Sequence, residues 1–144
     1  MIVITDSNIL FSALISPNGT VAKVLKSKSN IQIFAPDFLF EEIDNHFDKI
    51  VKHSKRSKKE IKSEVLSFKE TLNIINRKDI PKKDVQKAIT VVNDIDIDDF
   101  LFVALHFYTK HKLWTSDKEL IKGLLKKGYD ICITTTQLQK NLYK

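Results

Sequence analysis

Residues 93–107, NDIDIDDFLFVALHF, place a group of acids directly before a long apolar segment. Four aspartates fall within six residues: Asp94, Asp96, Asp98 and Asp99. Residues 100–109 contain no Asp, Glu, Lys or Arg, and they predict a helix that is apolar on all sides. Such a helix belongs in the middle of a domain. One or two acids are enough to cap a helix, so the surplus of negative charge indicates a second role.

Short apolar strands alternate with helical segments on both sides of this stretch. We expect strands at residues 1–5, 31–35, 73–77, 112–116 and 130–135. Helices are expected at residues 7–15, 20–27, 37–53, 54–72, 81–95, 98–110, 117–128 and 136–144. This alternation predicts an α/β fold, with one domain over residues 1–144 and a central parallel β-sheet of four to five strands flanked by helices.

The composition excludes several classes of protein. A chain of 144 residues suits one domain, and no apolar run approaches the 18 residues of a membrane span. The first residues, MIVITDSN, do not resemble a signal peptide. Cys132 is the single cysteine, so we expect a buried, unreactive thiol. These features predict a cytoplasmic protein that does not enter a membrane.

Positive charge is concentrated in one region of a chain whose net charge is +6. Residues 49–62 hold six Lys and one Arg against one Glu. A phosphate backbone would be attracted to this run, and Lys55, Arg56, Lys58 and Lys59 are its predicted nucleic-acid contacts. A solvated connection between two helices is the alternative interpretation.

Carboxylates recur where the predicted strands end. Asp6 follows the first strand, Glu41 and Glu42 lie on the helix after the second, and Asp117 follows the strand at 112–116. Asp99 opens the apolar helix. Ligands of open α/β sheets bind beyond the carboxyl ends of the strands, so four chain segments can deliver an acid to one site.

A divalent cation would relieve the repulsion among these acids. All-oxygen ligands favour Mg²⁺ or Mn²⁺ over zinc, and such an ion suits phosphodiester hydrolysis. Taken singly, each aspartate could instead be a helix cap, and we expect Asp94 and Asp98 to be surface or capping residues. The histidines show no metal-binding spacing and are assigned structural or surface roles, and no Phe or Tyr stands out as a base-stacking residue.

Four segments together resemble the PIN domain, a metal-dependent ribonuclease fold: IVITDSNILFSALI, FAPDFLFEEI, DIDDFLFVALHF and LWTSDKEL. The resemblance implies catalytic acids at Asp6, Glu42, Asp99 and Asp117, with Glu41 as the alternative to Glu42. It implies metal ligands at Asp6, Asp99, Asp117 and Asp96, and supporting roles for Asn8, Thr115 and Ser116. Many small PIN proteins are VapC-like toxins that cut RNA, are restrained by an antitoxin and often form homodimers.

Three functions are compatible with the sequence. The first is a Mg²⁺- or Mn²⁺-dependent endoribonuclease, either a toxin or an RNA-processing factor. The second is a non-catalytic RNA-binding or protein-interaction module with a PIN-like fold. The third is another α/β hydrolase or phosphotransferase that uses Asp6 as nucleophile or ligand, which the lack of a Gly-rich loop among three glycines disfavours.

Overall fold

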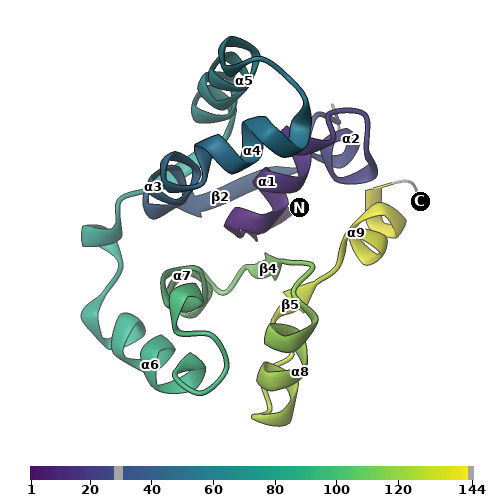
Figure 1. Cartoon of the computed structure of the whole chain (residues 1–144). Helices are drawn as coiled ribbons and strands as arrows, with labels where there is room; N and C mark the ends of the chain where they lie inside the picture. Colours follow the sequence, from purple (N-terminus) through teal and green to yellow (C-terminus); the bar gives the residue numbers. More distant parts are fainter. Residues whose placement is uncertain (28–30, 143–144) are drawn as a thin grey trace.

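A five-stranded, all-parallel sheet forms the centre of the chain (Figure 1). The computed structural model describes residues 1–27 and 31–142. The strand order is β3-β2-β1-β4-β5, and the strands are β1 (Ile2–Thr5), β2 (Gln32–Pro36), β3 (Asn73–Ile75), β4 (Lys112–Trp114) and β5 (Cys132–Ile133). Val3 pairs with Ile33 on one side and with Lys112 on the other. The predicted α/β fold is confirmed.

Helices connect the strands and cover the sheet. The first group is α1 (Ser7–Ile15), α2 (Thr20–Leu25), α3 (Phe38–Asn45), α4 (Phe47–Ser54) and α5 (Lys58–Thr71). The second group is α6 (Lys82–Val92), α7 (Phe100–Thr109), α8 (Lys118–Lys126) and α9 (Thr135–Leu142), with short 3₁₀ turns at Arg77–Asp79 and Ile97–Asp99. No described helix is long and apolar enough to cross a membrane.

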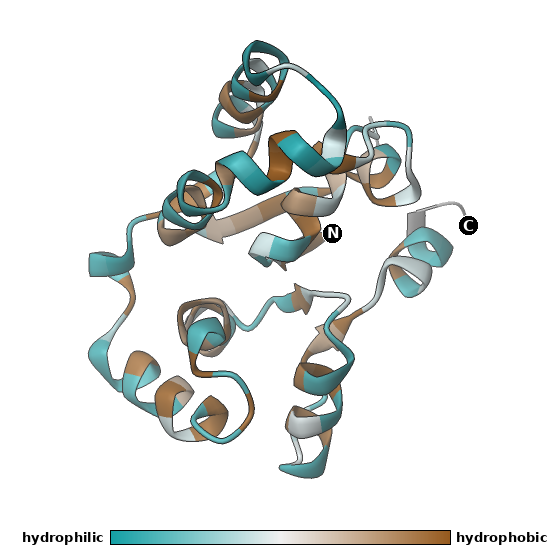
Figure 2. Cartoon of the chain, viewed as in Figure 1, coloured by the Kyte–Doolittle hydropathy of each residue, from teal (hydrophilic) through white to brown (hydrophobic). Residues whose placement is uncertain are grey.

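The core explains why α7 lacks a polar face. Phe102, Val103, Ala104 and Leu105 are each 0% exposed, so successive residues all round the helix are buried. Helices α4 and α5 differ from α7, because hydrophobic and hydrophilic residues both occur along their length (Figure 2). The sequence prediction of a central apolar helix is therefore confirmed.

Local differences from the predicted elements have identifiable causes. The expected helix at 37–53 breaks at His46, whose backbone leaves the helical region (φ −108°, ψ 12°), and continues as α4. Pro36, which lies between the expected strand at 31–35 and the expected helix at 37–53, is the last residue of β2. The helix expected from Asp98 begins at Phe100, because the 3₁₀ turn Ile97–Asp99 precedes it.

The environments of His106 and Cys132 shift the pKa values of their side chains. His106 directs Nδ1 at the carbonyl of His111 (2.7 Å), and burial lowers its pKa. Cys132 is half-buried, and burial raises the pKa of its thiol to about 12. A thiol with such a pKa stays protonated near neutrality and is a poor nucleophile.

Candidate metal-dependent active site

The strand order gives the sheet a switch point between β1 and β4, and we call the space beyond the carboxyl ends of these two strands the crevice. The chain runs outward from β1 through β2 to β3, then crosses to β4 on the other side of β1. Such a switch point is where open α/β sheets bind ligands. Asp6 directly follows β1, and Asp117 lies shortly after β4, so both acids stand at this point.

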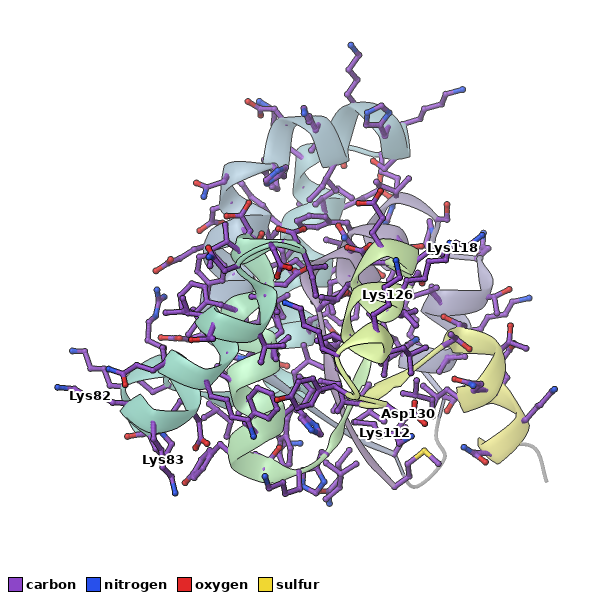
Figure 3. All side chains as sticks on the ribbon, turned by 90° about the horizontal axis from the view of Figure 1, so that it is seen from below. Lys82, Lys83, Lys112, Lys118, Lys126 and Asp130 are labelled. Carbon is purple, nitrogen blue, oxygen red and sulfur yellow. The ribbon has the colours of Figure 1, made fainter. Side chains whose placement is uncertain are left out.

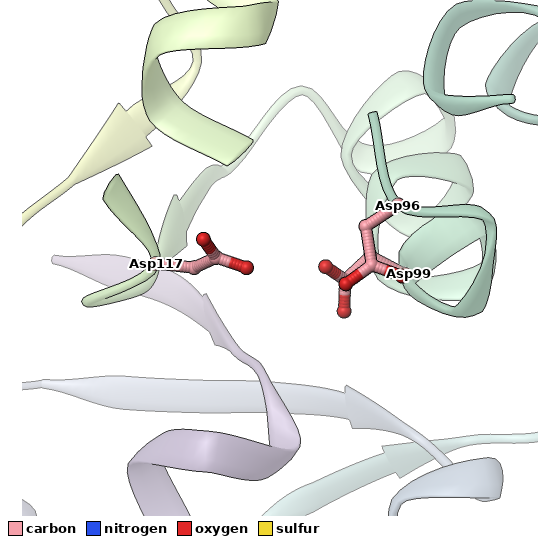
Figure 4. A group of neighbouring side chains, drawn as sticks. All are labelled: Asp96, Asp99 and Asp117. Carbon is pink, nitrogen blue, oxygen red and sulfur yellow. The ribbon is translucent and has the colours of Figure 1, made fainter. Parts of the chain in front are cut away.

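Three aspartates meet at the crevice and form what we call the acid cluster: Asp96, Asp99 and Asp117. One carboxylate oxygen from each lies within 4.8 Å of the others. Figure 4 shows Asp117 extending from one side toward Asp96 and Asp99 on the other. Asp117 also caps α8, since its Oδ1 accepts the N–H groups of Glu119 (3.1 Å) and Leu120 (3.2 Å).

Thr115 links Asp6 to Asp117 of the acid cluster. The Asp6 side chain is almost fully buried, and its Oδ1 caps α1 by accepting the N–H of Ile9 (3.0 Å). The hydroxyl of Thr115 donates to Asp6 Oδ2 (2.5 Å) and accepts the N–H of Asp117 (3.1 Å). The turn after β4 is therefore tied directly to the end of β1.

Glu42 and Glu41 have different partners, although they are adjacent on α3. The hydroxyl of Ser7 donates to Glu42 Oε1 (2.5 Å), which brings this half-buried glutamate beside the first turn of α1. Glu41 is exposed and forms an ion pair with Arg77 (2.6 Å). Arg77 also contacts Asp37 (3.1 Å), so Glu41 belongs to a surface ion-pair network.

The carboxylates at the crevice raise one another's pKa. Burial raises the pKa of Asp99 to about 8, and the charges of Asp96, Asp6, Asp117 and Glu42 add to this effect. Burial raises the pKa of Asp6 to about 6, against the opposing hydrogen bonds from Thr115 and Ile9. Burial also raises the pKa of Glu42. Burial is the largest cause of all three shifts, and repulsion between neighbouring carboxylates adds to it.

The donor set fits a hard divalent cation. Five acids surround the crevice: Asp6, Glu42, Asp96, Asp99 and Asp117. None of them forms an ion pair with a Lys or Arg that the structure describes. The ligand atoms are all carboxylate oxygens, which Mg²⁺ and Mn²⁺ prefer. A cation bound between Asp96, Asp99 and Asp117 would offset the repulsion that raises the pKa of Asp99.

The remaining residues predicted near the site do not belong to the acid cluster. Asn8 is exposed on α1, and Ser116 is exposed in the turn before Asp117. Asp94 is exposed and pairs with Lys127, away from the acid cluster. Asp98 is also exposed, and its N–H donates to Asp96 (3.1 Å), so Asp96 is the residue that caps the 3₁₀ turn Ile97–Asp99.

The predicted basic contacts lie at the turn between α4 and α5. Lys55, Lys58 and Lys59 are exposed. Arg56 is half-buried and pairs with Glu64 (2.5 Å) and Glu60 (3.7 Å), and it also donates to the carbonyl of Leu14 (2.9 Å). Arg56 therefore holds helices together within the fold, unlike its neighbours.

Sequence reasoning missed Ser7, which positions Glu42. A Ser directly after Asp6 reads as a shared capping residue, and its contact partner lies 35 residues away. No local signal in the sequence could have identified this pairing, because it depends on how α3 packs against α1.

Comparisons with known proteins agree with this architecture. VapBC2 from Rickettsia felis, solved bound to a DNA fragment from its promoter, aligns with a TM-score of 0.67 at 19% identity, over 93% of this chain and 97% of that one. A toxin-antitoxin complex from Klebsiella pneumoniae aligns with a TM-score of 0.56 at 18% identity, over 92% and 97%. No curated protein gives a significant sequence match. The sequence model of the PIN domain matches residues 4–141, and the chain therefore belongs to the PIN domain family.

Proposed function

We propose that this protein is a Mg²⁺- or Mn²⁺-dependent endoribonuclease that hydrolyses RNA phosphodiester bonds at Asp6, Glu42, Asp99 and Asp117. The observation that carries the proposal is the convergence of carboxylates from separate segments at the sheet's switch point, with the pKa of Asp99 raised to about 8. Membership of the PIN domain family and the net charge of +6 support a polyanionic substrate.

The residues of the site have different proposed roles. Asp96, Asp99 and Asp117 would hold the ion, which when bound activates water and polarises the phosphoryl group. Thr115 fixes Asp6 against the turn that carries Asp117, so Asp6 adds charge without moving. Ser7 orients Glu42 at the rim. Asp99, whose pKa is about 8, must lose its proton when the ion binds, so metal affinity should rise with pH.

A toxin of a toxin-antitoxin pair is the biological role that we propose. The similar solved structures from Rickettsia felis and Klebsiella pneumoniae are of toxin-antitoxin proteins, which supports an antitoxin partner here. We further propose a cytoplasmic location and a homodimer, both of which suit such a role. The exposed Lys55, Lys58 and Lys59 would contribute RNA affinity, whereas Arg56 would mainly position that turn.

The proposal is tested by incubating the purified protein with a mixed pool of single-stranded RNA. Cleavage should require Mn²⁺ or Mg²⁺ and should stop when EDTA is added. Asp117→Asn, purified in parallel, controls for contaminating nuclease, because Asn also caps helices well and α8 should persist. RNA that stays intact with Mn²⁺, or equal cleavage by Asp117→Asn, would favour the non-catalytic RNA-binding or protein-interaction module.

A further inference from the structure

Helix α4 packs beside α1 (Figure 1). It leads from α3, which carries Glu42, to the turn of Lys55, Lys58 and Lys59, here called the basic turn. At the start of α1, Ser7 bonds to Glu42 (2.5 Å). At its end, the carbonyl of Leu14 accepts a hydrogen bond from Arg56 (2.9 Å). The eight residues from the Asp6 cap to Leu14 span about 12 Å of helix. The surface along α4 therefore connects the acid site to the basic turn.

An aromatic pair lies one helical turn from the acids on this surface. Phe11 follows Ser7 by four residues, and His46 follows Glu42 by four. The rings of Phe11 and His46 are 5.3 Å apart between centroids and inclined at 34°. His46 is exposed, and its Nδ1 is 3.0 Å from the carbonyl of Glu42, which fixes the ring's place beside α3.

Basic side chains continue from the aromatic pair along α4. Lys49 and His53 follow His46 by three and seven residues, which places all three on the same side of the helix. All three are exposed. Lys55, also exposed, ends α4 in the left-handed conformation (φ 57°). The surface therefore carries aromatic rings next to Glu42, and N–H donors and positive charge toward the end of α4.

We propose that Phe11, His46, Lys49 and His53, here called the α4 track, bind single-stranded RNA next to the phosphate that is cut. An unstacked base would lie on the Phe11–His46 pair, and Lys49 and His53 would contact the phosphates that follow. The proposal rests on the proposed function, since it names the surface that the RNA strand follows beyond the cleavage site. An acidic peptide could use the charges, but continuity with a phosphodiester site and the ring pair at its rim favour RNA.

The first test measures binding of a short, fluorescein-labelled single-stranded RNA in EDTA, where no metal-dependent cleavage occurs. His46→Ala should raise the Kd about 5-fold or more, the lower end of what base stacking contributes. His46→Tyr should retain most of the affinity, because it keeps a ring against Phe11. A purely structural role for His46 predicts that both variants change the melting temperature and not the Kd of the folded protein.

The second test uses salt. Lys49→Ala should lower the slope of log Kd against log salt by about 0.7, the value for one lost contact with a single strand. Lys83→Ala is the matched control, because Lys83 is exposed near the start of α6 and projects from a separate edge of the molecule (Figure 3). The control should leave the slope unchanged.

The outcomes separate the track from the proposed function. If the parent cleaves RNA with Mn²⁺ but His46→Ala and Lys49→Ala bind and cleave as the parent does, the track is wrong and the nuclease stands. If binding follows the track but no RNA is cut, the track stands and the proposed function fails. Unchanged RNA affinity in both variants would overturn the proposal and leave this surface to a protein partner.

Discussion

Replacing Asp6 with Asn should make the metal-free protein more stable, although the Asp6 side chain is buried and accepts two hydrogen bonds. Its carboxylate caps α1 through Ile9 and accepts from Thr115. Asn can accept the same N–H bond and is an equally good cap. The substitution removes the negative charge, and burial has already raised the pKa of that carboxyl to about 6.

The magnitude follows from the pKa difference between the folded and unfolded states. Asp6 has a pKa of about 6 in the folded protein against 3.8 without the fold, so the folded state binds the proton more tightly. Its contribution to stability is therefore fully present below pH 3.8 and is lost as the pH rises through 6. A difference of about two pKa units corresponds to ~3 kcal/mol, which Asn avoids.

Urea unfolding in EDTA tests this prediction. At about pH 8 Asp6→Asn should exceed the parent by up to ~3 kcal/mol in the free energy of unfolding, and at about pH 4 the gain should nearly vanish. Asp44→Asn, which removes an exposed charge from α3, should stay within about 0.5 kcal/mol of the parent at both pH values. The reasoning is refuted if Asp6→Asn is less stable at pH 8, or if its gain does not depend on pH.

Three further predictions concern the metal and the RNA. Mn²⁺ at about 100 times its Kd should stabilise the parent against urea by ~2.7 kcal/mol, and Asp117→Asn should gain far less; equal gains would place the ion elsewhere. Asp96→Asn should slow Mn²⁺-dependent cleavage about 10- to 100-fold in single-turnover assays, because the ion would lose one of the three acids that would hold it, and full activity would remove Asp96 from the site. Reversing Lys55, Lys58 and Lys59 to Glu should weaken RNA binding and flatten its salt dependence without changing the turnover of saturated enzyme; an unchanged salt slope would show that this turn faces a different partner.

The strand ends were the most predictable part of this molecule. Asp6 and Asp117 follow short apolar runs, and parallel strands bring such positions to one edge of a sheet. The apolar segment at 100–109 could only be a buried helix, so the position of Asp99 at the start of this helix could also be predicted from the sequence. These inferences need only chain periodicity, which the sequence contains in full.

The hydrophobic periodicity of the sequence did not determine the roles of Glu41, Glu42 and Arg56, which depend on their partners in the folded protein. Glu41 and Glu42 are one residue apart on α3, and only their contacts with Arg77 and Ser7 distinguish them. Arg56 has the same local sequence environment as its basic neighbours, yet Glu64 reaches it from α5 and makes it part of the fold. Such pairings depend on how helices pack, and side-chain type along the chain does not specify them.

The helix break at His46 has the same origin. The apolar positions before and after it continue one helical period, so the sequence predicted a single helix. The break allows α4 to follow α1, as the Phe11–His46 and Arg56–Leu14 contacts show. His46, which was assigned a structural or surface role from the sequence, therefore lies within hydrogen-bonding distance of the Glu42 carbonyl.

Single-turnover cleavage of one labelled RNA with Mn²⁺ by Asp99→Asn and Asp98→Asn tests the central claim most directly. The two aspartates are adjacent, but Asp99 belongs to the acid cluster and Asp98 is exposed outside it. Asp99→Asn should cut at least about 10²-fold more slowly than the parent, the scale expected when charge stabilisation is lost at a reacting centre, and Asp98→Asn should cut at close to the parent's rate. Equal rates for the two variants, whether both fast or both slow, would contradict a metal-dependent site built on Asp99.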